Sequence, residues 1–152
     1  MAFLSSMNIV ASGFTAQQLR LDIISENVTN STTTRVEDGE GAYRRKMVVF
    51  EAKTGRDGFR RAMARAASGM VPNDAAAGGV RVTQIVDDPS PMHMVYDPTH
   101  PDANEDGYLE MPNVDMVKEI TDAMAATQAF SANVTMFNTM KTVITDGLQI
   151  GK

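Results

Sequence analysis

Residues 3–30 read FLSSMNIVASGFTAQQLRLDIISENVTN, and their apolar side chains recur at alternating intervals of four and three. A spacing of about 3.5 residues keeps side chains on one edge of an α-helix and is typical of a coiled-coil seam. The pattern therefore predicts a helix over 5–30 whose apolar edge needs a partner surface. The members of this first seam are Phe3, Met7, Val10, Phe14, Gln17, Leu21, Ile24 and Val28.

Gly13 lies inside this predicted helix. Glycine costs about 1 kcal/mol relative to alanine in a helix interior, so the position predicts either a kink or a close approach of another backbone. The helix is expected to end near Asn30, because the short polar side chains that follow compete for backbone hydrogen bonds.

A second amphipathic stretch follows Pro112, with Asn113 as the predicted N-cap and Asp115 favourably placed for the helix dipole. Its apolar residues recur at intervals of three or four when the polar Thr127 and Lys141 fill two positions, which predicts a helix of about 35 residues. A helix this long is expected to pack against another long element. The members of this second seam are Val117, Ile120, Met124, Phe130, Val134, Phe137, Ile144 and Leu148.

The middle of the chain predicts short strands. Residues 42–51 are rich in β-branched and aromatic side chains, residues 79–86 alternate apolar and polar, and residues 92–96 form a shorter candidate. Prolines keep the intervening chain extended. Residues 53–79 are expected to form a long loop with one helical stretch over 59–67.

The basic residues Arg44, Arg45 and Lys46 open the first of these predicted strands. Successive side chains of a strand point to opposite faces, so the cluster would be divided between them. We interpret it as a solvated strand edge and not as a nucleic-acid site.

Composition limits the classes of function. With 152 residues, 43% of them apolar, the chain suffices for one modest domain, and the lack of cysteine excludes disulfides and thiolate metal sites. A net charge of −5 argues against a nucleic-acid partner. Residues 35–70 carry +4 and residues 71–152 carry −8, which suits either copies stacked head to tail or a basic loop facing another partner.

Motifs for chemistry are incomplete. Asp102, Asn104 and Asp106 resemble the start of a calcium loop, but Asn113 stands where the bidentate glutamate belongs, so a polar turn is predicted. The two histidines, His93 and His100, do not belong to a set of nucleophile, base and orienting residue, because the sequence has no Gly-x-Ser-x-Gly motif. We therefore expect no enzyme activity, no catalytic residue, no metal and no cofactor.

No targeting segment is expected at the N-terminus, because residues 1–19 lack Lys and Arg and have no unbroken apolar run. No stretch reaches the roughly 18 apolar residues that a membrane span needs, so direct membrane insertion is not expected. If the protein leaves the cytoplasm, it uses a route without a cleaved signal peptide of the usual kind.

The sequence resembles bacterial flagellar axial proteins at residues 11–17 and 25–30, where the motif residues are Ser12, Gly13, Ser25, Asn27 and Asn30. Further along, it is similar to the proximal-rod members of the flagellar basal-body rod protein family. The stretches that carry this similarity are 43–50, 79–82, 88–91, 96–98, 100–103, 106–108 and 112–115. It departs from the family at Thr29 and over 53–78, where we expect a loop insertion.

The resemblance implies a structural subunit of the proximal rod, the drive shaft and export channel that transmits torque to the hook. It implies a rod position spanning the periplasm, export by the flagellar type III apparatus, and terminal helices that line the axial channel. The implied partners are copies of the chain, other rod proteins, the export apparatus and the inner-membrane ring and rod base.

Together these patterns predict an α+β chain with an axial helix and motif over 1–34, a β-rich middle over 35–112 and a second axial helix over 113–152. The helices are expected to form a coiled-coil-like axial domain around a small antiparallel middle region. Asn27 and Asn30 are expected to fix helix register between subunits, since a buried asparagine penalises misaligned pairings. The alternative is a cytoplasmic adaptor, a binding module that presents a coiled coil to one partner.

Overall fold

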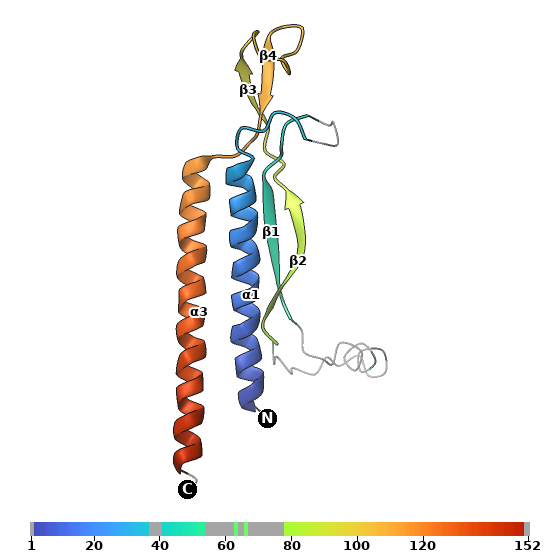
Figure 1. The fold of residues 1–152 in the computed structure, drawn as a ribbon. Coiled ribbons are helices and arrows are strands. Elements are labelled where there is room, and N and C mark those ends of the chain that lie inside the picture. Colours follow the sequence, from blue (N-terminus) through green and yellow to red (C-terminus); the bar gives the residue numbers. More distant parts are fainter. Residues whose placement is uncertain (1, 37–40, 54–62, 64–65, 67–77, 151–152) are drawn as a thin grey trace. The chain divides into compact units, whose positions relative to one another are not determined.

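The computed structural model describes residues 2–36, 41–53, 63, 66 and 78–150. Two long helices flank short strands in the chain, which confirms the α+β class, whereas coiled-coil geometry stays a prediction. The elements in chain order are α1 (Ala2–Thr29), β1 (Lys46–Ala52), β2 (Val80–Asp87), β3 (His93–Tyr96), β4 (Tyr108–Met111) and α3 (Met116–Ile150) (Figure 1).

The strands form two separate antiparallel pairs, β1 with β2 and β3 with β4. At the two ends of the first pair, the Lys53 amide donates to the Gly79 carbonyl and the Asp88 amide donates to the Arg45 carbonyl, as antiparallel chains require. In the second pair Tyr96 lies opposite Tyr108.

The chain divides into two compact units. The junction unit comprises Gln18–Val49 and Gln84–Gln128, and the helix-end unit comprises Met1–Gln17, Phe50–Thr83 and Ala129–Lys152. Each unit contains part of α1 and part of α3. The boundaries of the two units therefore differ from the predicted domain boundaries. The predicted division into 1–34, 35–112 and 113–152 stays a prediction.

The predicted strands match the structure in place but not in every boundary. The first begins at Lys46 instead of residue 42, and β3 confirms the candidate at 92–96. The sequence pattern does not predict β4, because this strand is only four residues long and a polar turn precedes it. The expected helical stretch over 59–67 lies outside the described residues except for Met63 and Ala66.

The N-cap of α3 is Asp115, so the prediction of Asn113 was wrong. The carboxylate of Asp115 accepts hydrogen bonds from the amides of Val117, at 2.9 Å, and Lys118, at 3.4 Å. An acidic cap also suits the positive end of the helix dipole. Asn113 precedes the helix and is engaged elsewhere, as described below.

The turn before β4 is held by an asparagine. The Asn104 side-chain oxygen accepts from the amides of Asp106 and Tyr108, and Gly107 has a φ of 79°. Glycine reaches such a φ without strain. The region is thus a polar turn, as expected from the sequence.

Candidate functional site

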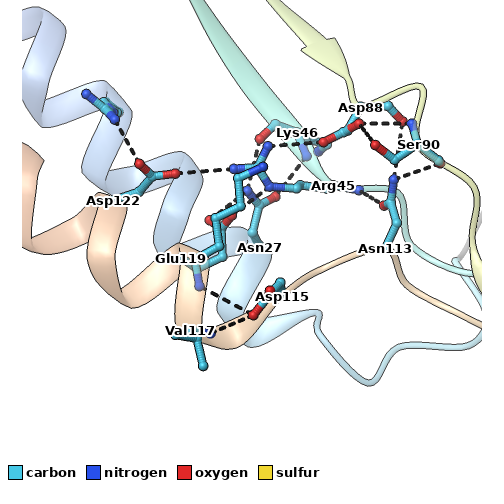
Figure 2. A network of polar contacts seen from close by, with 12 residues as sticks. Asn27, Arg45, Lys46, Asp88, Ser90, Asn113, Asp115, Val117, Glu119 and Asp122 are labelled. Carbon is cyan, nitrogen blue, oxygen red and sulfur yellow. Dashed lines mark hydrogen bonds and ion pairs between the residues drawn. The ribbon is translucent and has the colours of Figure 1, made fainter.

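Asn27 is the centre of a buried polar network in the junction unit (Figure 2). Its side-chain nitrogen donates to the Lys46 carbonyl, at 2.9 Å, and to the Glu119 carboxylate, at 3.1 Å. Its oxygen accepts from the Tyr43 hydroxyl and the Lys46 amide, both at 2.9 Å. With 1% exposure, Asn27 uses all four of its hydrogen-bonding positions inside the chain.

This arrangement corrects the register prediction for Asn27, because no donor or acceptor of its side chain remains free for a neighbouring subunit. Asn30 is also engaged locally, since its side chain donates to the Glu26 carbonyl and accepts from the Thr33 hydroxyl. Asn27 therefore binds α1 to β1 and α3, and Asn30 makes local hydrogen bonds at the C-terminal end of α1. Of the other motif residues, Ser25 is exposed, and its carbonyl accepts from Thr29.

Arg45 is buried beside three carboxylates, so the interpretation of this basic cluster as a solvated edge was wrong for Arg45. Its Nε contacts Glu119 at 2.6 Å, and its two terminal nitrogens contact Asp88 at 3.2 Å and Asp122 at 3.5 Å. Arg44 is exposed, as expected. A guanidinium is suited to this role, because its five donors form a planar fork.

Electrostatics keep this cluster charged. Burial alone would lower the pKa of Arg45, but the hydrogen bonds and charges of Glu119 and Asp88 outweigh it, so the pKa is raised. The hydroxyl and amide of Ser90, followed by Arg45, lower the pKa of Asp88. Removal of Arg45 would leave Glu119 buried without its cationic partner, and removal of Glu119 would leave Arg45 with only Asp88 and Asp122.

Tyr43 is a buried member of the network that stays neutral. Burial, followed by the nearby charges of Glu26, Asp87 and Glu119, raises its pKa to about 12. The neutral hydroxyl can therefore donate to Asn27 across the physiological pH range.

Asn113 joins the strand region to the start of α3. Its oxygen accepts from the Arg45 amide at 2.8 Å, and its nitrogen donates to the carbonyls of Asp88 and Ser90. The network thus ties the end of α1, the start of β1, the turn after β2 and the first turns of α3 to one another.

The helix-end unit has a sparser contact between the helices. The rings of Phe14 and Phe130 lie 4.2 Å apart at their centroids. A Cβ added to Gly13 would lie 3.1 Å from the Asn133 side chain. The sequence pattern predicted either a kink or the close approach of another backbone at Gly13. The structure shows a close approach, but the neighbour is the side chain of Asn133.

Ser12 and Gly79 form the second close contact of this unit. The buried Ser12 hydroxyl accepts from the Val80 amide at 3.0 Å and donates to the Ile9 carbonyl at 2.7 Å. Gly79 has a φ of 99°, and an added Cβ would lie 2.0 Å from this hydroxyl oxygen. Only glycine fits there without movement of α1 or the strand.

The first seam does not coincide with the buried face of α1. Of its members, only Ile24 is buried, while Phe14 is exposed and the side chain of Phe3 lies outside the described ones. The remaining members are partly exposed: Met7, Val10, Gln17, Leu21 and Val28. Among the side chains of α1 from Ser6 onward, the other buried residues are Ser12, Ala16, Ile23 and Asn27.

The second seam is more exposed still. Phe130 and Ile144 are partly exposed, and the other members are exposed, namely Val117, Ile120, Met124, Val134, Phe137 and Leu148. The buried residues of α3 are instead Glu119 and Ala126. The described part of the chain therefore leaves most of this apolar edge uncovered.

No group of side chains suited to a metal ion occurs among the described residues. Within the same residues, no helix is long and apolar enough to cross a membrane.

Comparison with known proteins gives a consistent result. The family described as "Flagellar basal body rod FlgEFG protein C-terminal" matches residues 105–150. The chain is 41% identical to flagellar basal-body rod protein FlgC of Bacillus subtilis, over 97% of both chains. It is 38% identical to FlgC of Borreliella burgdorferi, over 99% of this chain and 98% of the relative, and 36% identical to FlgC of Escherichia coli O6:H1, over the full length of both.

Proposed function

The chain belongs to the FlgC family of flagellar basal-body rod proteins, and from this membership we propose that its terminal helices assemble the rod by packing against neighbouring subunits. Family membership makes it a structural protein of the basal body that associates with other basal-body proteins, and favours the rod protein over the adaptor. The mode of assembly is our proposal.

The exposed second seam is the observation that carries this proposal. Val117 is 74% exposed, and Met124 and Leu148 are each 69% exposed. These side chains lie along α3, so a neighbouring helix that covered them would gain about 25 cal/mol for each Å² of apolar surface removed from water. The positions of α3 that the chain itself covers are small or polar by contrast. Ala126 is buried, and Asp122 contacts Arg20 and Arg45.

Gln17 gives independent support on α1. It is the polar member of the first seam, and its buried side-chain oxygen has no hydrogen-bond partner in the described part of the chain. A buried acceptor without a donor costs free energy, which a donor from an adjacent subunit would relieve.

A contact between different surfaces of successive subunits propagates as a helix when it does not close into a ring. Seams at both ends of the chain are suited to such propagation. In the rod this would give a tube that transmits torque to the hook and encloses the export channel. Its neighbours would be copies of the chain, other rod proteins and the inner-membrane ring and rod base.

We also propose that the chain reaches its place in the periplasm-spanning rod through the flagellar type III apparatus, without a cleaved signal peptide. Among the described residues of the helix-end unit only Ser12 and Ala16 are buried, and so few buried contacts suit this route because little has to be unfolded before threading. An export assay of the full chain in type III-deficient cells would test this step.

The assembly proposal is tested by Met124→Asn, with Met136→Asn as a matched control. Both methionines are exposed on α3, but only Met124 belongs to the second seam. We expect Met124→Asn to abolish swimming and reduce rods in purified basal bodies at least tenfold, while Met136→Asn swims normally. Normal motility of Met124→Asn would contradict the proposal.

A further inference from the structure

The hairpin of β3 and β4 has one largely exposed face, which Thr34, Arg35, Gly41 and Ala42 border on one side. Side chains alternate along strands, and the register places Met94 opposite Glu110 and Tyr96 opposite Tyr108. These four residues therefore share a face, which we call the tyrosine face. Met94, Tyr96 and Tyr108 are 54%, 65% and 45% exposed.

On the opposite face Leu109 anchors the hairpin, since it is buried at 5% exposure, while Val95 on that face is 45% exposed. The rings of Tyr96 and Tyr108 stand edge to face with centroids 5.3 Å apart. The Tyr96 ring packs against the turn at Gly107, where an added Cβ would lie 3.0 Å from it. Two rigid, exposed tyrosines offer a large contact area at low entropic cost.

The surroundings of the tyrosine face are strongly acidic. Residues 93–111 contain no Lys or Arg, and their carboxylates are Asp97, Asp102, Glu105, Asp106 and Glu110. The side chain and amide of Thr99 lower the pKa of Asp97, which keeps that carboxylate ionised. No ion pair to Lys or Arg involves these five in the described part of the chain.

A hollow of about 350 Å³ adjoins the tyrosine face. Its walls include Tyr108, Glu110, Asp102 and Thr34, with Arg35 as the one cation among its described lining residues. An arginine or lysine entering this hollow would meet an aromatic ring and two carboxylates, which is the environment that cations favour.

We propose that the tyrosine face docks a basic segment of a different basal-body protein, which inserts an arginine or lysine beside Glu110 and Tyr108. The partner surface carries positive charge around an apolar centre, complementary to the acidic rim and the tyrosine pair. Two copies of the hairpin would repel one another, so a self-association of these faces is disfavoured. The inference rests on the proposed role in the basal body.

A photo-crosslinking amino acid at position 96 tests this docking in intact basal bodies. The control places the same group at position 93, where the exposed His93 belongs to the other face of the hairpin. We expect a cross-link from position 96 but not from 93, to a peptide of another protein that contains Lys or Arg. The absence of this cross-link, an acidic peptide, or a peptide from the chain itself would overturn the proposal.

A charge exchange then tests the electrostatic part. Glu110→Lys should lower the cross-link yield from position 96 at least tenfold, and reversal of the contacting basic residue in the partner should restore it. An unchanged yield in Glu110→Lys would contradict the proposal. Quantifying the chain in purified basal bodies separates the outcomes, because failure of the docking alone leaves it in the rod.

Discussion

The junction unit and the helix-end unit differ in how they are held together. In the junction unit, Asn27, Arg45 and Glu119 are buried in a shared set of hydrogen bonds and ion pairs. In the helix-end unit the only buried residues among those described are Ser12 and Ala16. Among the described residues, the same two helices therefore have many buried polar contacts over one half and few buried residues over the other.

This difference indicates where the subunit is self-sufficient. A helix draws most of its stability from packing and not from intrinsic propensity. The junction unit supplies much of that packing within one chain, although Val117 and Met124 stay exposed there. We propose that the helix ends gain their packing from neighbouring subunits. Under the proposed assembly, the chain is a folded junction with two helix ends that neighbouring subunits would cover.

The largest expected effect is in the junction. Glu119→Ala removes the carboxylate that contacts Arg45 and Asn27, and leaves a buried guanidinium with reduced compensation. We expect a loss of about 3–5 kcal/mol in the free energy of unfolding, measured by urea denaturation of the monomer. Glu119→Gln keeps an acceptor for Asn27 and should lose less. A loss below about 1 kcal/mol in Glu119→Ala would show that the junction is not the stable part.

Alkaline pH gives a second, smaller test of the junction. The pKa of Tyr43 is raised to about 12, so the folded state favours its neutral form. The contribution of neutral Tyr43 to the free energy of unfolding is fully present below pH 10, the pKa of tyrosine in the unfolded chain. It is lost as the pH rises toward the folded-state pKa of about 12. We expect a loss of roughly 2 kcal/mol over this interval. Tyr43→Phe, which cannot ionise, should show a shallower dependence, and identical slopes would contradict the role of Tyr43.

The smallest effect is expected in the helix-end unit. Phe130→Ala removes the contact with Phe14, but both rings are at least partly exposed, so the monomer should lose only about 1 kcal/mol in unfolding free energy. Phe137→Ala is the control, because Phe137 has no aromatic partner among the described residues. If Phe130→Ala destabilised the monomer as much as Glu119→Ala, the contrast between the units would not hold.

Both long helices were predictable because their periodic patterns run over many turns and do not depend on distant residues. The short strand β4 and the cap at Asp115 were missed, since each depends on a few residues whose local signals compete. Asn113, for instance, is a good cap by residue type, yet it pairs with Arg45 instead.

The polar network could not be predicted from local patterns. Arg45 and Glu119 are 74 positions apart in the sequence, and no local pattern around either residue indicates that the two are in contact. The seams illustrate the converse case. Their pattern was evident in the sequence, but the pattern alone does not distinguish a surface buried inside the chain from one left for a neighbour, and the exposure of Val117 and Met124 was needed to separate them.

Hydrogen exchange of the full chain, as a monomer and in assembled rods, tests the central contrast most directly. Amide protection reports local stability, so it can be read separately for each half of each helix. We predict protected amides over 18–29 and 116–128 in the monomer, with weak protection over 2–17 and 129–150 that rises at least tenfold in rods. Equal protection of both halves in the monomer, or no gain on assembly, would contradict the account.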